Sequence, residues 1–217
     1  MRLDILTLFP EMFAPLEASI IGRARKKKAI EINLVNFRDY SADLHKKVDD
    51  KPFGGGDGML LTCQPIYDCV NALDPKGEAK RIYMCPKGKI FNEQIAKTLA
   101  SNYNHIIILC GHYEGVDERV LELCNFERLS IGEYVLTGGE LPAMVVVDAV
   151  ARLAEGVLSR ESCFENESFY NGYLEHPQYT RPQEFKGLKV PEVLVGGNHA
   201  EVAKWKKENS KKVEQKK

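Results

Sequence analysis

Two glycine-bearing stretches are the first places in this sequence where residue types and spacing could bind a ligand. GHYEGVDER (111–119) follows the apolar stretch 105–110, and SIGEYVLTGGELPA (130–143) follows the apolar run 126–131. Glycine permits positive φ and lets another group approach the backbone closely. In a parallel α/β sheet, loops at the carboxyl ends of strands line one crevice. The two stretches together predict a ligand site, although an ordinary strand–turn–helix connection would explain either one alone.

A third glycine-rich stretch is KPFGGGDGM (51–59). Four of the five residues 54–58 are glycine, so this stretch cannot be the interior of a helix or strand. Its N–H groups could bind a flat or anionic ligand. A flexible linker is the alternative, but the stretch runs directly into an apolar segment, and we therefore favour ligand binding. It is not a phosphate-binding P-loop, because the Gly-Lys-Ser/Thr ending is absent.

Several common types of site are not indicated by the sequence. No Gly-x-Gly-x-x-Gly follows the first expected strand, and there is no serine nucleophile elbow, His-Glu-x-x-His motif or credible triad. The five histidines are scattered. His112 lies in a glycine loop, where we interpret it as a hydrogen-bonded loop residue rather than a base.

Composition and charge indicate a soluble globular protein that works in the cytoplasm. The 217 residues suit one large domain or one domain with a small appendage. No apolar run approaches the ~20 residues of a membrane span, and the amino-terminal residues resemble a first strand, not a signal peptide. Six cysteines without close pairing predict free thiols in a reducing compartment, not structural zinc. No metal-ligating set is expected.

The net charge of −1 excludes binding of nucleic acid by bulk electrostatics. Contact with nucleic acid would require local basic patches, and the candidates are residues 23–28 and 204–217. Solvated ends of helices explain each patch equally well.

Alternating elements position these loops. Strands are expected over residues 3–9, 30–37, 81–85, 105–110 and 126–131, and helices over about 11–27, 65–73, 92–100, 116–124 and 141–154. Residues 38–52 are expected to form a loop, and residues 86–88 a turn. The alternation predicts an α/β fold, with a mostly parallel sheet and helices on both faces.

After residue 158 the sequence becomes polar and loses helical or strand periodicity. We expect a first domain over 1–158, a polar interdomain linker over 159–175 and a small helical domain over 176–217, with its last helix from about residue 199. The last domain has fewer than fifty residues, so it must pack on the first domain or on a second subunit.

Five ordered motifs carry a resemblance to a known family. GHYEGVDER, SIGEYVLTGGELPA, KPFGGGDGM, HPQYTRP (176–182) and GNHAEVAKW (197–205) resemble the bacterial tRNA (guanine-N1-)-methyltransferases, TrmD, of the SPOUT superfamily. The resemblance runs from the first strand to at least Trp205. It implies a deep trefoil knot, which nothing in the periodicity indicates. The family's carboxyl-terminal domain is usually longer, so a reduced tRNA-binding surface is expected here.

The resemblance also implies an activity. Methyl is transferred from S-adenosyl-L-methionine to N1 of the guanosine on the 3′ side of the tRNA anticodon. The enzyme is a cytoplasmic homodimer without a membrane anchor, its active site lies at the subunit interface, and the transfer depends on Mg²⁺. Three alternative functions are a SPOUT enzyme that methylates a ribose 2′ hydroxyl, a non-enzymatic tRNA-binding protein, and a nucleotide-binding regulator. The missing P-loop ending disfavours the last of these.

The resemblance assigns residues to the methyl donor and to tRNA. The donor pocket is carried by Tyr83, Met84, Cys85, Pro86, Gly88, Gly111, Tyr113, Glu114, Ser130, Ile131, Gly132, Tyr134, Val135, Leu136, Gly138, Gly139 and Pro142. The tRNA-binding residues are Asp50, Gly55, Gly56, Gly58, Met59, Glu175 and Gln178. Gln178 stands where many members have histidine.

Methylation of guanine N1 needs a base for the departing proton and a cation near the guanine oxygen. The residues offer Arg152 and the carboxylates Glu165, Glu167 and Glu175. The resemblance assigns Arg152 to the guanine oxygen. It assigns the base to Glu167, where the family usually has aspartate; glutamate keeps the carboxylate and adds one methylene. Because Glu167 lies in a segment with little expected structure, we expect tRNA binding to order it.

Overall fold

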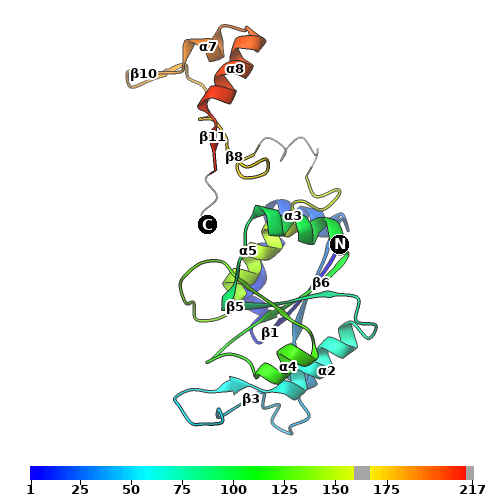
Figure 1. The fold of residues 1–217 in the computed structure, drawn as a ribbon. Coiled ribbons are helices and arrows are strands. Elements are labelled where there is room, and N and C mark those ends of the chain that lie inside the picture. Colours follow the sequence, from blue (N-terminus) through cyan, green and yellow to red (C-terminus); the bar gives the residue numbers. More distant parts are fainter. Residues whose placement is uncertain (159–166, 214–217) are drawn as a thin grey trace. The chain divides into compact units, whose positions relative to one another are not determined.

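The computed structural model describes residues 1–158 and 167–213, which belong to two compact units, Met1–Leu158 and Ser159–Lys217 (Figure 1). The first eight residues of the expected linker, 159–166, and the last four of the expected second domain, 214–217, lie outside the described residues. Among those described, no helix is long and apolar enough to cross a membrane.

A five-stranded sheet forms the centre of the first unit. Its strands are β1 (Arg2–Thr7), β2 (Glu31–Asn36), β5 (Lys80–Ile90), β6 (His105–Cys110) and β7 (Glu127–Ser130). The order is β2-β1-β6-β5-β7, and every neighbouring pair is parallel. Ile5 of β1, for example, lies opposite Leu34 and Ile108. The mostly parallel α/β sheet expected from the sequence is confirmed.

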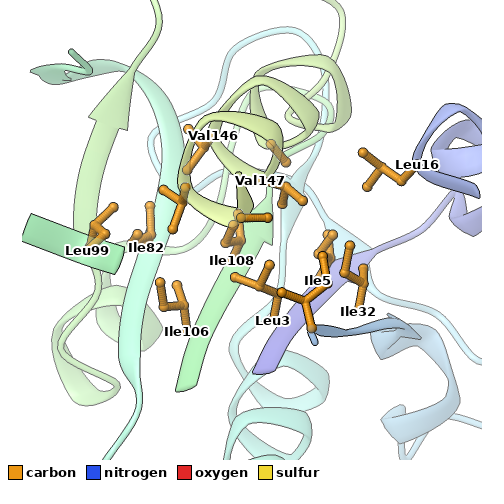
Figure 2. Packing of buried hydrophobic residues seen from close by; sticks show 14 of the residues in the cluster. Leu3, Ile5, Leu16, Ile32, Ile82, Leu99, Ile106, Ile108, Val146 and Val147 are labelled. Atoms are coloured by element: carbon orange, nitrogen blue, oxygen red, sulfur yellow. The ribbon is translucent and has the colours of Figure 1, made fainter. Parts of the chain in front are cut away.

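Helices cover both faces of the sheet (Figure 1). One face carries the 3₁₀ helix η1 (Pro10–Glu17), α1 (Ser19–Lys26), α3 (Glu93–Asn102) and α5 (Glu140–Ala151). The other carries η2 (Phe37–Tyr40), α2 (Cys63–Leu73) and α4 (Glu118–Leu123). Strand side chains alternate between the two cores: Ile106 and Ile108 pack beneath α5, where Figure 2 shows them with Val146 and Val147, and Ile107 and Leu109 pack on the opposite face.

Two local expectations were wrong. The helix expected over 11–27 is interrupted at Ala18, because Pro15 lies in its first half and Ser19 has a φ of +53°. The turn expected at 86–88 is part of β5, which continues to Ile90 after a shift in its register with β7.

Gly88 permits that continuation, because a Cβ there would lie 2.6 Å from the carbonyl carbon of Arg128. The remaining boundaries of the expected strands and helices differ by at most three residues, and the strand expected over 105–110 has those bounds in the structure. The expected loop 38–52 contains η2 and β3 (Asp49–Asp50), which pairs with β4 (Leu60–Leu61).

The second unit consists of short elements. They are β8 (Tyr173–Leu174), β9 (Glu184–Phe185), β10 (Leu188–Lys189), α7 (Glu192–Val195), α8 (His199–Asn209) and β11 (Lys211–Lys212). Asn198 caps α8, since its side chain accepts hydrogen bonds from the N–H groups of Ala200 and Glu201. None of residues 167–213 is fully buried. The aromatic contacts of this unit join Trp205 to the rings of His176 and Tyr179, 5.9 and 6.3 Å away.

The five cysteines among the described residues are free. Burial raises the pKa of the Cys69 thiol to about 12, so this thiol remains protonated at neutral pH. Cys163 lies outside the described residues.

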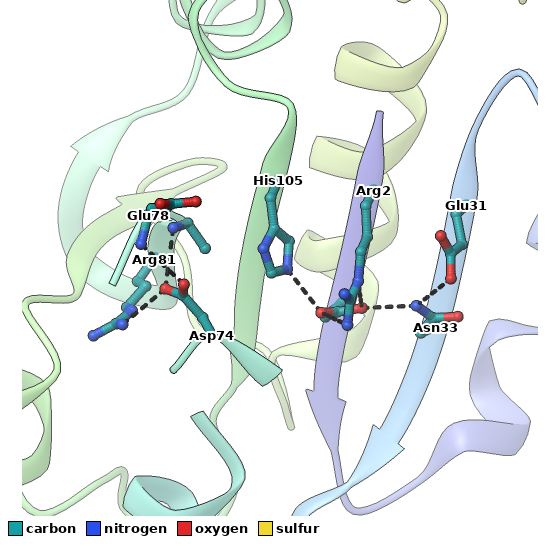
Figure 3. A network of polar contacts seen from close by, with 9 residues as sticks. Arg2, Glu31, Asn33, Asp74, Glu78, Arg81 and His105 are labelled. Carbon is teal, nitrogen blue, oxygen red and sulfur yellow. Dashed lines mark hydrogen bonds and ion pairs between the residues drawn. The ribbon is translucent and has the colours of Figure 1, made fainter. Parts of the chain in front are cut away.

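Buried carboxylates join elements at the opposite end of the sheet from the glycine loops (Figure 3). Asp4, which is fully buried, accepts hydrogen bonds from Arg2 and Asn33 and contacts His105 Nε2 at 2.8 Å. Asp74 accepts from Arg81 at 2.8 Å and from the N–H groups of Glu78 and Ala79. Burial alone would raise the pKa of Asp74, but the hydrogen bonds outweigh burial and lower it.

Replacing Asp74 with asparagine is expected to lower the free energy of unfolding at pH 7 by on the order of 3 kcal/mol, because the Arg81 guanidinium loses a buried partner. A lowered folded-state pKa stabilises the fold above the unfolded pKa, and this contribution disappears as the pH falls towards the folded value. Urea unfolding between pH 7 and pH 3 should therefore show a shrinking difference from wild type. Substitution of the exposed Asp57 by asparagine is the control. An equal difference at every pH would contradict the prediction.

Candidate active site

A cavity of about 370 Å³ lies at the carboxyl ends of β5, β6 and β7. Three segments form it: the irregular part of β5, the loop after β6, and the stretch from β7 to the start of α5. The volume is in the range of small-molecule sites. The carboxyl edge of a parallel sheet is where such sites are expected in open α/β folds.

The structure brings together the residues that the resemblance assigns to the methyl donor. All of them except Gly88 line the cavity: Tyr83, Met84, Cys85, Pro86, Gly111, Tyr113, Glu114, Ser130, Ile131, Gly132, Tyr134, Val135, Leu136, Gly138, Gly139 and Pro142. Gly88 does not line it but packs against β7 behind the wall. Backbone packing against Arg128 and Leu129 explains why glycine stands at this position.

Two of the loops are held together backbone to backbone. The Gly139 N–H donates to the carbonyl oxygen of Gly111 at 2.8 Å. A Cβ on Gly139 would lie 2.7 Å from both Cys110 Cα and Gly111 N. Gly139 has a φ of −83°, which any residue can adopt. Glycine is required here for close approach and not for its conformational freedom.

Tyrosine rings form part of the cavity wall. Burial raises the pKa of Tyr83 to about 12, so its phenol stays neutral at physiological pH. A Cβ on Gly111 would lie 2.9 Å from the Tyr83 ring. Tyr113 has a φ of +56° and is half exposed, and its ring meets the His112 ring edge-on at 4.7 Å.

Sequence reasoning missed the charged residues of the wall, Lys87, Glu118 and Arg128. Arg128 and Glu118 form an ion pair, and their hydrogen bond raises the pKa of the arginine. Glu118 belongs to the stretch 111–119, Arg128 precedes the stretch 130–143 by two residues, and Lys87 stands between Pro86 and Gly88, but only the fold directs each of them to the cavity. The other lining residues that were not assigned are His112, Gly115, Val116, Leu121, Leu129 and Thr137.

His112 differs from its expected role. Its Nδ1 is buried and has no hydrogen-bond partner. The ring is instead held between aromatic neighbours, since Phe9 lies 4.9 Å away and Tyr113 packs on it. The interpretation of His112 as a hydrogen-bonded loop residue was therefore wrong for this nitrogen.

The glycine-rich stretch forms an arm between β3 and β4. Gly54, Gly55, Gly56 and Gly58 all have positive φ, and a Cβ on any of the first three would meet no atom within 4 Å. Phe53 beside them is 98% exposed. The tip of this arm is thus an open surface, as a loop that receives a large ligand requires.

The base of the arm is hydrogen-bonded to the loop after β6, which lines the cavity. The Glu114 N–H donates to Met59 O, and the Leu61 N–H donates to Gly115 O, each at 3.0 Å. A Cβ on Gly58 would lie 2.5 Å from the Glu114 side chain. Of the predicted tRNA-binding residues in this region, Gly58 and Met59 lie beside the cavity loop. Gly55 and Gly56 lie at the open tip, and Asp50 is exposed on β3.

The predicted catalytic residues are distributed over both units. Arg152 caps the carboxyl end of α5 in the first unit, and its N–H donates to Asp148 O at 3.1 Å. Glu167 begins a turn in the second unit, where its carbonyl accepts from the Tyr170 N–H at 3.3 Å.

The other predicted residues of the second unit contact each other. The Gln178 amide donates to the Glu175 carboxylate at 3.3 Å. Glu165 lies outside the described residues. Within residues 1–158 and 167–213, no three His, Cys, Asp or Glu side chains come together as a metal site.

Comparison with known proteins identifies the family. The family model for tRNA (Guanine-1)-methyltransferase TrmD matches residues 1–217. The chain belongs to this family. A tRNA (guanine-N(1)-)-methyltransferase of Ruminiclostridium cellulolyticum is 56% identical over 213 residues, which is 97% of this chain and 91% of that protein.

Further relatives carry the same name. A Clostridium botulinum protein is 52% identical over 210 residues, covering 97% of this chain and 87% of its own length. One from Alkaliphilus oremlandii is 51% identical over 218 residues with the same two coverages. The TrmD resemblance carried by the five motifs is confirmed.

Proposed function

We propose that this chain transfers the methyl group of S-adenosyl-L-methionine to N1 of the guanosine on the 3′ side of the tRNA anticodon. TrmD proteins are adenosylmethionine-dependent tRNA (guanine-N1)-methyltransferases, and the family matches the whole chain. The observation that carries the proposal is the convergence of three family loops on one cavity of suitable size. The tRNA substrate follows from membership, and the position 3′ to the anticodon is the finer part of the proposal.

The cavity residues fit the donor. Gly111 and Gly138 bring backbone to the cavity surface, where it can bind the adenine and ribose, and Gly139 holds the two loops together. Glu114 and Glu118 place carboxylates in a wall that would face a sulfonium and an ammonium group, and Arg128 offers a cation for a carboxylate. The bound donor supplies a methyl group on a positively charged sulfur that leaves as a neutral thioether.

Catalysis requires alignment, charge stabilisation and removal of one proton. The cavity holds the donor so that guanine N1 can approach the methyl group in line with the carbon–sulfur bond. The Glu167 carboxylate takes the N1 proton, and the Arg152 guanidinium stabilises the negative charge that develops on the guanine oxygen. The N1–carbon bond forms as the carbon–sulfur bond breaks, and the proton remains on Glu167.

The knotted backbone and the dependence on magnesium belong to the same proposal. The chain from 130 to 139 returns to the loop after β6, where Gly139 bonds to Gly111; this return supports the trefoil knot of SPOUT proteins. Magnesium dependence is expected from the resemblance, but we derive no step through the metal, because the described residues form no set of ligands for it.

We also propose a homodimer with its active site at the subunit interface. Helix α5 is largely buried, yet Leu141 and Val145 on its outer side are about half exposed. Met12 and Ile20, on η1 and α1, are each 39% exposed, and η1 contacts both α5 and α1. An apolar surface next to the cavity is typical of an interface. The described part of the second unit has no fully buried side chain, so it needs a surface on which to pack.

Mixing an Arg152→Ala protein with a Glu167→Ala protein tests the interface. If one active site takes these residues from different chains, a heterodimer has one intact site. A random mixture is half heterodimer, so the mixture should regain about a quarter of wild-type activity. Native mass spectrometry would establish subunit exchange. Exchange without recovery would assign both residues to the same chain.

The reaction is tested with tRNA transcripts that differ only at the base 3′ to the anticodon. Labelled methyl from adenosylmethionine should enter the transcript with guanine there and none of the others. Mass spectrometry of the nucleoside should identify N1-methylguanosine. A 2′-O-methylated nucleoside would indicate the ribose-methylating alternative, and tRNA binding without turnover would indicate a non-enzymatic binding protein.

A further inference from the structure

A buried carboxylate lies behind the cavity wall, outside the proposed catalytic pair. Glu140 is the first residue of α5 and is only 2% exposed. The Thr7 hydroxyl donates to Glu140 Oε1 at 2.8 Å and accepts the Phe9 N–H at 3.0 Å. The second bond occupies an acceptor site of the hydroxyl and leaves its proton for Glu140. The carboxylate therefore joins the end of β1 to the start of α5.

The other carboxylate oxygen faces the loop that lines the cavity. A methyl group placed on Gly138 would overlap Glu140 Oε2 and would lie 3.3 Å from His112 Nδ1. Gly138 and His112 both line the cavity, whereas Glu140 does not. Oε2 and Nδ1 thus border the same side of Gly138, one from α5 and one from the loop after β6.

His112 Nδ1 and Glu140 Oε2 could each supply the hydrogen-bond partner that the other requires. A buried imidazole nitrogen without a partner is costly, and a buried carboxylate is stable only with sufficient donors. The start of α5 favours the negative charge, but Thr7 is the side-chain donor that the structure gives Glu140. Packing by Phe9 and Tyr113 keeps the His112 ring beside the carboxylate.

We propose that Glu140 is a positioning residue for the methyl donor, acting through His112. In the donor-bound state, His112 Nδ1–H donates to Glu140 Oε2, and this bond holds Gly138 and the loop after β6 in their binding positions. The inference rests on the proposed function, since it assigns the cavity to adenosylmethionine. Neither residue receives the substrate proton, so the pair contributes to donor affinity and not to the chemical step.

Calorimetric titration with adenosylmethionine tests the pair. Losing a hydrogen bond to a charged group should raise the Kd of Glu140→Ala about ten- to a hundredfold. Glu140→Gln, which keeps the shape and an acceptor oxygen, should restore most of the affinity. At saturating donor, kcat should stay within a few-fold of wild type. In a double-mutant cycle, the Kd of the His112→Ala, Glu140→Ala double variant should be no higher than that of Glu140→Ala alone, because both substitutions remove the same bond.

The outcomes separate this inference from the proposed function. Wild type that neither binds adenosylmethionine nor methylates tRNA would refute the proposed function. If wild type binds the donor, either of two results would refute the pair. One is an unchanged Kd in folded Glu140→Ala, and the other is a double variant whose rise in Kd equals the product of the two single rises. A merely structural role would lower the melting temperature without changing the Kd of the folded fraction. If Glu140→Ala does not fold, His112→Ala alone decides: it removes the same bond and should raise the Kd by the same factor, and an unchanged Kd would refute the pair.

Discussion

Replacing Glu167 with glutamine should lower the turnover of methyl transfer by about 10²–10⁴-fold, the usual cost of losing a general base. Glutamine keeps the shape of the side chain but cannot take the guanine N1 proton. Adenosylmethionine affinity should not change, because the cavity proposed for the donor is built from residues of the first unit. Single-turnover kinetics with saturating tRNA and donor would measure the chemical step, and calorimetry would measure the affinity.

Two further substitutions sharpen the assignment of the base. Glu167→Asp restores the carboxylate usual in the family and should keep most of the activity. Glu175→Gln is the matched control; Glu175 is bonded to Gln178, and we propose a tRNA-positioning role for it. If Glu167→Gln turns over within a few-fold of wild type while Glu175→Gln or Glu165→Gln does not, the base is another carboxylate.

Replacing Gly139 with valine should abolish measurable donor binding. A Cβ at this position meets Cys110 Cα and Gly111 N at 2.7 Å, so the two loops must separate. Separating the loops displaces the backbone that would contact the donor, and the two methyl groups of valine enlarge that displacement. The glycine motif alone predicts a steric block with the fold largely intact. The structure indicates a backbone shift as well, so thermal unfolding should be measured beside the calorimetry.

Gly196→Ala is the control for this substitution. Gly196 has a φ of −76°, and a Cβ there would make an ordinary contact with Glu192 O at 3.5 Å. This variant should bind the donor as wild type does. A folded Gly139→Val protein with unchanged donor affinity would exclude the cavity as the donor site.

The sequence motifs are sufficient to identify two of the loops that line the cavity. Stretches 111–119 and 130–143 each follow a buried strand, and their glycines indicate close backbone approach. Parallel strands place such loops at one edge, so their convergence could be predicted from the order of elements alone. The assignment of particular residues came from the family resemblance. Arg152 and Glu167 follow from that resemblance, since residue spacing alone would make Arg152 an ordinary surface residue of a helix.

Local patterns failed where long-range contacts decide the backbone. Residues 86–88 have the composition of a turn, but β5 continues through them because Gly88 lets β7 approach closely. Pro15 was visible in the sequence, yet the apolar spacing of residues 11–27 favoured one continuous helix. The structure divides it, since proline and the positive φ of Ser19 outweigh that spacing.

The sequence by itself determined the family and the parallel α/β fold, and it singled out the glycine loops 111–119 and 130–143, because these depend on residue types at short separations. Only the tertiary structure decided that Thr7 bonds to Glu140 and that Glu140 and His112 border the same side of Gly138. Thr7 and Glu140 are 133 positions apart, and no local pattern records such a contact. It arises because β1 and β6 are neighbours in the sheet and α5 packs over both. Packing of the sheet against α5 thus places the Glu140 carboxylate near the loop after β6, whose motif, 111–119, does not include Glu140.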